Sequence, residues 1–164
     1  MYYKDDTIII REFTPQEFDL FSSLFENVNV TRYLPYKTPD EYKEMFEKAL
    51  ADYKDGPFSR WGIFNAENNE FIGMCLARIF LDYPSQLEIG YTLGENYWGK
   101  GLGTRVCKAL VQYCLSLDKN KDVVAVTDLD NIGSQKVLTK SGFNRIENLI
   151  REDRELAYFV LQKN

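Results

Sequence analysis

The chain has 164 residues, of which 45% are hydrophobic and 15% aromatic, enough apolar content for a sizeable core in one domain. Its net charge of −5 argues against the clustered Lys and Arg of a nucleic-acid surface, and it contains no histidine, the commonest general base and metal ligand. We therefore expect no metal site, and any catalysis must depend on carboxylates, hydroxyls or backbone groups. The first residues are charged and no apolar run reaches the length of a membrane span, which predicts a cytoplasmic protein without membrane association.

The three cysteines lie within apolar segments. Cys75, Cys107 and Cys114 are odd in number and lack the close spacing of a metal site. We predict that they are small core residues of a protein in a reducing compartment, without chemistry of their own.

The N-terminal third predicts a strand followed by two helices. Residues 7–13 (TIIIREF) form an apolar run typical of a strand, and Pro15 opens a helix expected to reach about Asn27. Thr38 and Glu41 have the spacing of a capping box with proline at the first helical position, which predicts a second helix.

The middle of the chain predicts three antiparallel strands. Two apolar segments flank a turn at residues 66–69 and predict a hairpin. The segment QLEIGYTL alternates apolar and polar residues, ends at Gly94 and predicts the third strand.

After Gly94 the pattern changes to that of a βαβ unit. Apolar residues recur at helical spacing from Leu102 to Leu117, and the run DVVAVT (residues 122–127) is typical of a strand buried on both faces. A further helix is expected from about residue 131, with Gly142 as a left-handed C-cap, before two last strands. The predicted fold class is α/β (α+β), with a mixed, mostly antiparallel sheet, one parallel strand pair and helices on both faces.

Glycines cluster between the third antiparallel strand and the helix that follows it. In YWGKGLGT, Gly99, Gly101 and Gly103 occupy alternate positions where a strand leads to a helix N-terminus. Such a turn exposes successive N–H groups beside the positive end of the helix dipole, which favours phosphate binding. The alternative is that the glycines merely shape a turn and allow close packing, and spacing alone does not decide between the two.

Two familiar nucleotide motifs do not fit this stretch. A Walker loop needs Ser or Thr after its Gly-Lys pair, whereas Lys100 is followed by Gly101. The dinucleotide fingerprint G-x-G-x-x-G comes early in an all-parallel fold, whereas this G-x-G-x-G pattern follows antiparallel strands. Nucleoside triphosphates and dinucleotides are therefore poor candidates.

Two motifs together resemble the GNAT superfamily of acetyl-CoA-dependent N-acetyltransferases. WGKGLGT resembles the Q/R-x-x-G-x-G/A pyrophosphate loop of the superfamily, and NIGSQKVLTKSGF resembles its second signature, an Asn followed by a helix and Gly-Phe. With the order of elements, the resemblance covers nearly the whole chain, as a single acetyltransferase domain of residues 1–164. It is closest to the branch that includes acetyltransferases of ribosomal-protein N-termini, in which Trp replaces Gln or Arg, as Trp98 does here.

The resemblance implies an acetyl-CoA site. Backbone N–H groups of residues 99–104 would hold the pyrophosphate, with added charge from Lys100 or Arg105, although both side chains also suit a solvated surface. The strand at residues 91–93 would pair with the pantetheine arm where the parallel strands splay, and Asn131 would bond to the arm or act as an N-cap. The implied cofactor-binding residues are Tyr91, Thr92, Leu93, Trp98, Gly99, Lys100, Gly101, Leu102, Gly103, Thr104 and Asn131.

The resemblance also implies direct transfer of the acetyl group to a primary amine in a ternary complex. Glu88 is the candidate base, working through water, and its alternative is an exposed carboxylate paired with a lysine. A backbone N–H near Tyr91 would polarise the acetyl carbonyl. Many members carry a tyrosine at the position of Leu138 as proton donor, so Ser134 becomes the candidate donor here, unless it is merely a serine of the first helical turn.

The acceptor is the least specified partner. The resemblance favours a protein N-terminal α-amine over a small-molecule amine, entering near residues 31–37 and 81–85, where Tyr33 and Tyr36 could line the entrance. The alternative function is a non-catalytic acyl-CoA-binding or sensing module. Monomer and homodimer both stay open.

Overall fold

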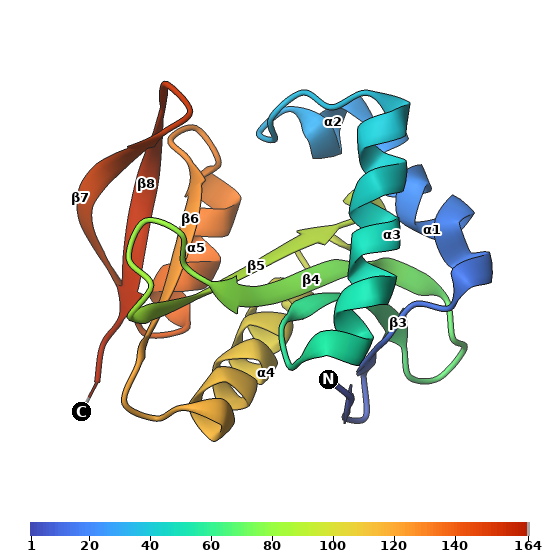
Figure 1. Cartoon of the computed structure of the whole chain (residues 1–164), viewed down its shortest axis with the longest axis horizontal. Helices are drawn as coiled ribbons and strands as arrows, with labels where there is room; N and C mark the ends of the chain where they lie inside the picture. The colour runs from blue at the N-terminus through green and yellow to red at the C-terminus, as the bar shows by residue number, and fades with distance from the viewer. Residues whose placement is uncertain (164) are drawn as a thin grey trace. The chain divides into compact units, whose positions relative to one another are not determined.

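Eight strands form one sheet in the order β1-β2-β3-β4-β5-β6-β8-β7 in the computed structural model, which describes residues 1–163 (Figure 1). The strands are β1 (Tyr3–Lys4), β2 (Ile8–Arg11), β3 (Ser59–Asn65), β4 (Phe71–Ile79), β5 (Gln86–Leu93), β6 (Asp122–Asp128), β7 (Phe143–Arg151) and β8 (Arg154–Leu161). The helices are α1 (Phe18–Ser23), α2 (Val28–Thr31), α3 (Pro39–Asp55), α4 (Leu102–Leu117) and α5 (Ile132–Lys140), with 3-10 turns η1 (Pro15–Glu17), η2 (Leu24–Glu26) and η3 (Glu95–Tyr97).

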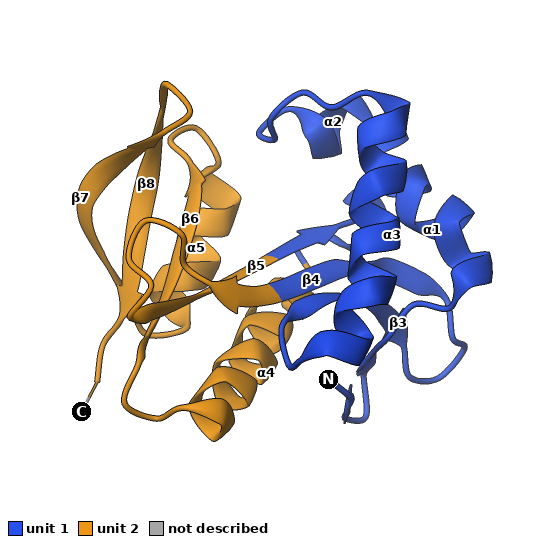
Figure 2. Cartoon of the chain, in the orientation of Figure 1, with its two compact units in different colours: residues 1–76, 91–99 blue, residues 77–90, 100–164 orange. Residues whose placement is uncertain are grey.

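The chain divides into two compact units, which Figure 2 colours separately. The first contains residues 1–76 and 91–99, and the second contains residues 77–90 and the chain from residue 100 onward. β4 and β5 each contribute residues to both units.

In the first unit, α3 packs on β3 and α1 around an aromatic core (Figure 1). The helix begins as predicted: the Glu41 N–H donates to the Thr38 hydroxyl at 3.2 Å, and the Thr38 N–H donates to the Glu41 carboxylate at 3.0 Å. Some rings of the core meet edge to face, as Phe13 and Phe21 do at a centroid distance of 5.8 Å, and others, such as Phe13 and Phe46, are tilted. The buried core cluster consists of Phe13, Phe21, Leu24, Phe46, Phe64 and Met74.

The first predicted helix, from Pro15 to about Asn27, is present as consecutive helical turns from Pro15 to Glu26, of which only α1 is α-helical. η1, α1 and η2 cover the predicted segment, and Asn27 is the N-cap of α2, because its side chain accepts from the Asn29 N–H at 2.8 Å. Ser22 and Ser23 donate their hydroxyls to carbonyls three residues earlier. Such local bonds compete with a regular helix, which the apolar pattern alone did not reveal.

In the second unit, β6 lies between β5 and β8. It pairs with β8 antiparallel from Val124↔Val160 to Asp128↔Leu156, and β8 pairs with β7 across a tight turn. That turn is formed by Glu152 and Asp153, which both have positive φ values, of 53° and 60°. α4 and α5 pack against each other and on β6.

The parallel pair joins β5 to β6 over a short length. Gln86, Leu87 and Glu88 face Asp122, Val123 and Val124, whereas β5 continues to Leu93 and β6 to Asp128. No pairing between these later residues is seen in the described part of the chain. The mixed sheet with a parallel pair at the βαβ unit confirms the predicted fold class.

The cysteines are free and buried, as predicted. Burial raises the pKa of the Cys107 thiol to about 11 and that of Cys114 to about 12, and it raises the pKa of Cys75 still further. A thiol that stays protonated is a poor nucleophile, so these side chains are core residues. Among the helices of the described residues, none is long and apolar enough to cross a membrane.

Candidate active site

The glycine loop, residues 98–104, contains two positions with a backbone conformation that residues other than glycine rarely adopt. Gly99 and Gly101 have φ values of +71° and +79°, in the left-handed region. A Cβ atom at either position would meet nothing within 4 Å, so these glycines are required by the backbone conformation and not by lack of space. Gly103 differs from them because it lies inside α4 and is buried.

The N-terminus of α4 has no side-chain cap among the described residues. Its N-cap residue is Gly101, no side chain bonds to the cap and the first turn holds no acidic residue. The Arg105 N–H makes the first bond of the helix, to the Gly101 carbonyl at 3.3 Å. The N–H groups before it carry the positive end of the helix dipole without an intrahelical acceptor, which suits an anion. The side chain of Leu102 is buried, so this residue contributes its backbone to the loop.

Trp98 fastens the start of the loop to the end of β5. Its indole Nε1 donates to the Leu93 carbonyl at 2.9 Å, while 43% of the residue remains exposed. Glu95, in η3 between them, accepts from the side chains of Asn27 at 3.1 Å and Asn29 at 2.8 Å. The segment that precedes the glycines is therefore held at both ends by side-chain bonds.

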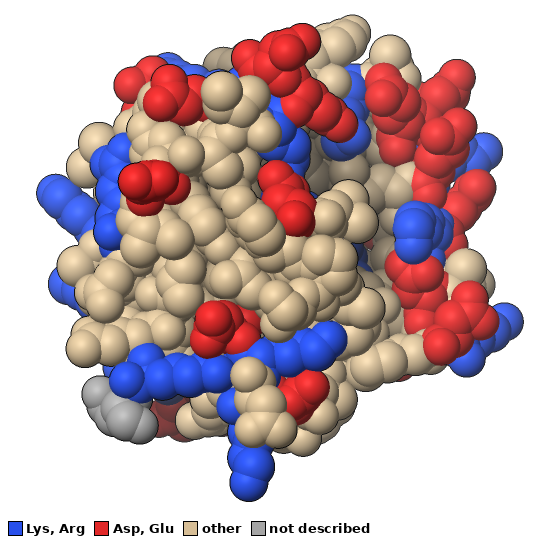
Figure 3. Space-filling model, turned by 60° about the vertical axis from the view of Figure 1, so that its left-hand side comes forward, with Lys and Arg blue, Asp and Glu red and all other residues tan. Residues whose placement is uncertain are grey.

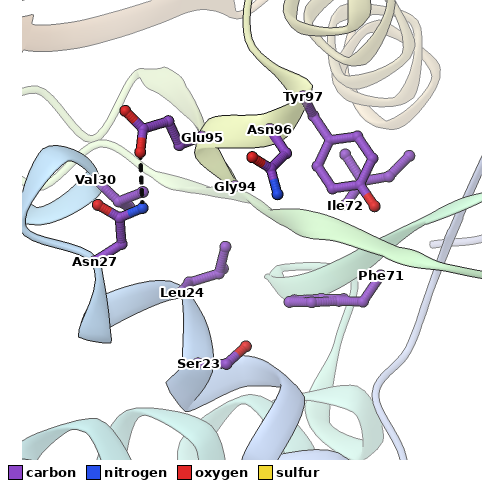
Figure 4. Close-up of a pocket in the computed structure, with 10 residues that line it drawn as sticks. All are labelled: Ser23, Leu24, Asn27, Val30, Phe71, Ile72, Gly94, Glu95, Asn96 and Tyr97. Atoms are coloured by element: carbon purple, nitrogen blue, oxygen red, sulfur yellow. Dashed lines mark hydrogen bonds between the residues drawn. The ribbon is translucent and has the colours of Figure 1, made fainter.

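A pocket of about 200 Å³ lies beside η3 (Figure 4). It has an apolar floor and a polar rim on which the Glu95 carboxylate faces Asn27. None of the predicted site residues lines it. Its lining residues are Ser23, Leu24, Asn27, Val30, Phe71, Ile72, Gly94, Glu95, Asn96 and Tyr97.

Asn131 caps α5, as the alternative interpretation of this residue predicted. Its Oδ1 accepts from the Ser134 N–H at 3.1 Å. Within the described residues, neither the Asn131 amide nitrogen nor the Ser134 hydroxyl has a hydrogen-bond partner. Leu138, where the family resemblance would place a tyrosine donor, is 2% exposed and packs in the core.

Glu88 is buried and held by two arginines. The side chain is 5% exposed; Arg78 Nε donates to its Oε1 at 2.7 Å, and Arg151 Nη1 donates to its Oε2 at 3.4 Å. The alternative of an exposed carboxylate paired with a lysine is therefore wrong. A buried carboxylate needs such charged donors, because moving the ionised group out of water costs on the order of several kcal/mol.

Arg151 is shared between two carboxylates. Its Nη2 donates to Asp82 Oδ1 at 3.3 Å, and its guanidinium carbon lies 5.3 Å from the centre of the Phe80 ring. Asp82 belongs to the loop of residues 81–85, one of the two segments predicted near the acceptor. The other segment places Tyr36 88% exposed and Tyr33 partly buried.

Charged side chains are interspersed on the face drawn in Figure 3, where among the described residues neither sign forms a continuous field. A nucleic-acid surface would show clustered Lys and Arg instead.

The sequence profile of the acetyltransferase (GNAT) domain family matches residues 7–144 of this chain. The chain belongs to the GNAT acetyltransferase family. It is therefore an enzyme of the acyltransferase class, as the two glycine-containing motifs indicated.

Relatives and solved structures agree with this family membership. An uncharacterized N-acetyltransferase of Bacillus subtilis, YoaA, is 28% identical over 150 residues, which cover 90% of this chain and 84% of the relative. A putative ribosomal-protein-serine acetyltransferase from Vibrio cholerae superposes with a TM-score of 0.81 at 17% identity, over 98% of this chain and 97% of that one. RimL, a ribosomal-protein acetyltransferase solved with coenzyme A, gives 0.81 at 15% identity, over 98% and 97%.

Sequence reasoning missed the partners of Glu88 and Glu95. Arg78 is 10 residues from Glu88 and Arg151 is 63, while Asn27 and Glu95 are 68 residues apart. An arginine among the apolar residues of a strand was the available signal for Arg78. Nothing in the local sequence marks Arg151, since its role depends on the register of β7.

Proposed function

We propose that this chain is an acetyl-CoA-dependent N-acetyltransferase that acts on a primary amine and works as a single domain. The observation that carries the cofactor assignment is the uncapped N-terminus of α4 behind two glycines with positive φ. N–H groups of residues 99–104 would bind the pyrophosphate, and Lys100 would add charge.

Residues in and before α5 fit the rest of the cofactor. The N-cap bond fixes the side chain of Asn131, which would donate its amide N–H to the pantetheine arm. The backbone of residues 91–93 would pair with the pantetheine arm through groups other than the Leu93 carbonyl, which already accepts from Trp98. When bound, acetyl-CoA supplies the acetyl group and a thiolate leaving group. Ser134 would donate a proton to that thiolate.

Glu88 is proposed as the base that takes the proton from the acceptor amine, directly or through water. Its burial and its fixed Oε1 favour one orientation of the carboxylate. The Tyr91 N–H would donate to the acetyl carbonyl as negative charge develops there.

The acceptor is proposed to be a protein N-terminal α-amine. Structural relatives whose names give ribosomal proteins as substrates support this class. The loop of residues 81–85, which carries Asp82, is the proposed entrance. Free, buried cysteines support a cytoplasmic location.

Calorimetric titration tests the cofactor. Acetyl-CoA and CoA should bind, while ATP and NAD should bind at least about tenfold more weakly, because they lack the pantetheine arm. No acetyl-CoA binding by the folded protein would contradict the proposal.

An acceptor screen tests the reaction. Released thiol is measured with peptides that have a free N-terminus, with the same peptides N-terminally blocked and with spermidine. Thiol release with free peptides alone supports an α-amine acceptor. Binding of acetyl-CoA without transfer to any amine would instead favour a non-catalytic acyl-CoA module.

A further inference from the structure

Four charged side chains of the second unit form an alternating row, Arg78, Glu88, Arg151 and Asp82. They come from β4, β5, β7 and the loop of residues 81–85. Arg78 contacts Glu88, Glu88 contacts Arg151, and Arg151 contacts Asp82, at 2.7, 3.4 and 3.3 Å. The row therefore holds two positive and two negative charges.

The two arginines hold Glu88 differently. Arg78 makes a short bond to Oε1, whereas Arg151 makes a longer one to Oε2 and divides its guanidinium between two carboxylates. If Arg151 leaves Glu88, it still keeps Asp82 and the Phe80 ring as partners. If Arg78 leaves, its described carboxylate partner is lost. Release of Arg151 from Glu88 therefore costs less free energy than release of Arg78.

The backbone of Arg151 is also held in place by strand pairing. It ends β7, next to the tight turn of Glu152 and Asp153, and pairs with Arg154 of β8. Across the row, the loop of residues 81–85 is anchored by Tyr83, whose ring stacks on Tyr158 of β8 at 6.4 Å. A shift of one side chain between fixed carboxylates therefore needs no movement of the backbone.

Building on the proposed function, we propose that Arg151 is an exchangeable partner of Glu88 that gives way to a cationic acceptor. When a protonated amine arrives, its N–H takes the place of Arg151 Nη1 on Glu88 Oε2, and Arg151 turns fully to Asp82. The amine is thereby selected as a cation and placed on the carboxylate that later receives its proton. Arg151 is a positioning residue, because it acts through Glu88.

A double-mutant cycle tests the exchange. Asp82→Asn removes the alternative partner of Arg151 and should raise the acceptor KM about fivefold, since Arg151 then competes for Glu88. Arg151→Gln removes the competitor and should lower the acceptor KM about threefold, and the double variant should match Arg151→Gln. Arg145→Gln is the matched control on β7, because Arg145 bonds to Gln135 and Asn148 outside the row.

The directions of these effects separate exchange from a structural role. If Asp82→Asn and Arg151→Gln both raise the acceptor KM, and add in the double variant, the row is merely structural and the proposal is overturned.

Side-chain NMR gives a readout that needs no turnover. In protein labelled with ¹⁵N-arginine, the Nε–H signal of Arg151 is identified by its loss in Arg151→Gln, and spermidine or a free-amine peptide is then titrated. The Arg151 signal should shift with the amine and not with an N-terminally blocked peptide. An unmoved signal would overturn the exchange. A failure of acetyl-CoA to bind would overturn the proposed function alone, so the two failures are distinguishable.

Discussion

The glycine loop and the charged row around Glu88 differ in what determines their structure. The loop owes its shape to the backbone of consecutive residues, with φ values of +71° at Gly99 and +79° at Gly101. The row unites distant side chains, since its bonded pair Asp82 and Arg151 is 69 residues apart in the chain. Local backbone conformation can be inferred from residue types, whereas the partners of a buried charge depend on strand register.

The two regions also tolerate change differently. The loop depends on backbone N–H groups, which every residue except proline supplies. Only the positions with positive φ therefore require glycine. The row depends on particular charged groups, and removal of one leaves another without its counter-charge. Substitutions can therefore separate a backbone role from a side-chain role.

The largest effect is expected from the row. Glu88→Gln keeps the size of the side chain but removes the proposed base, and kcat should fall about a hundredfold with little change in acetyl-CoA affinity. Steady-state kinetics beside calorimetry measure both quantities. Glu155→Gln is the control, since Glu155 accepts from Asn148 at 3.0 Å on the surface. An unchanged kcat would remove Glu88 from the reaction.

In the loop, Gly101→Val should weaken acetyl-CoA binding about tenfold or more, because a β-branched residue is strained at positive φ. Gly56→Val is the matched control: Gly56 has extended backbone with a φ of 166°, and a Cβ there would meet nothing within 4 Å. Calorimetry on both variants makes the comparison. Equal affinities would mean that the loop conformation does not serve the cofactor.

Asn131 combines a backbone role with a side-chain role, and two substitutions divide them. Asn131→Asp keeps the N-cap acceptor but loses the amide donor, so stability should hold while acetyl-CoA affinity falls about fivefold. Asn131→Ala should lose that affinity and also about 1 kcal/mol of stability. Thermal melts measure the stability of the two variants, and calorimetry measures their affinity for acetyl-CoA. If Asn131→Asp binds like the unchanged protein, the residue is an N-cap and nothing more.

The smallest effect is expected at Trp98. Trp98→Phe keeps an aromatic ring but loses the bond to the Leu93 carbonyl, worth about 1 kcal/mol, so acetyl-CoA should bind about threefold more weakly. A titration measures the change. A loss as large as that of Gly101→Val would show that the side chain, and not the backbone of the loop, governs binding.

Much of the fold could be predicted from local patterns. The capping box at Thr38, the βαβ unit and the left-handed Gly142, with a φ of 92°, follow from residue type and spacing, and all are present. The helix expected from Pro15 to about Asn27 is present, but its two ends are 3-10 turns, a detail that apolar periodicity does not predict.

The candidate site also has some features that local sequence predicts and others that it does not. Sequence placed Glu88 on a strand and Asn131 at the start of a helix, which the structure has. It could not supply Arg78, Arg151 or Asp82 as partners of that carboxylate. The roles of these residues toward cofactor and acceptor stay predictions.

By itself, the sequence determined which family the chain resembles and where its backbone must bend, because glycine spacing and apolar periodicity act over a few residues. Only the tertiary structure decided that Glu88 is buried between Arg78 and Arg151, and that Arg151 is shared with Asp82. The physical reason is that a buried charge must find counter-charges wherever the sheet brings them, and strand pairing, which joins distant segments, fixes that choice.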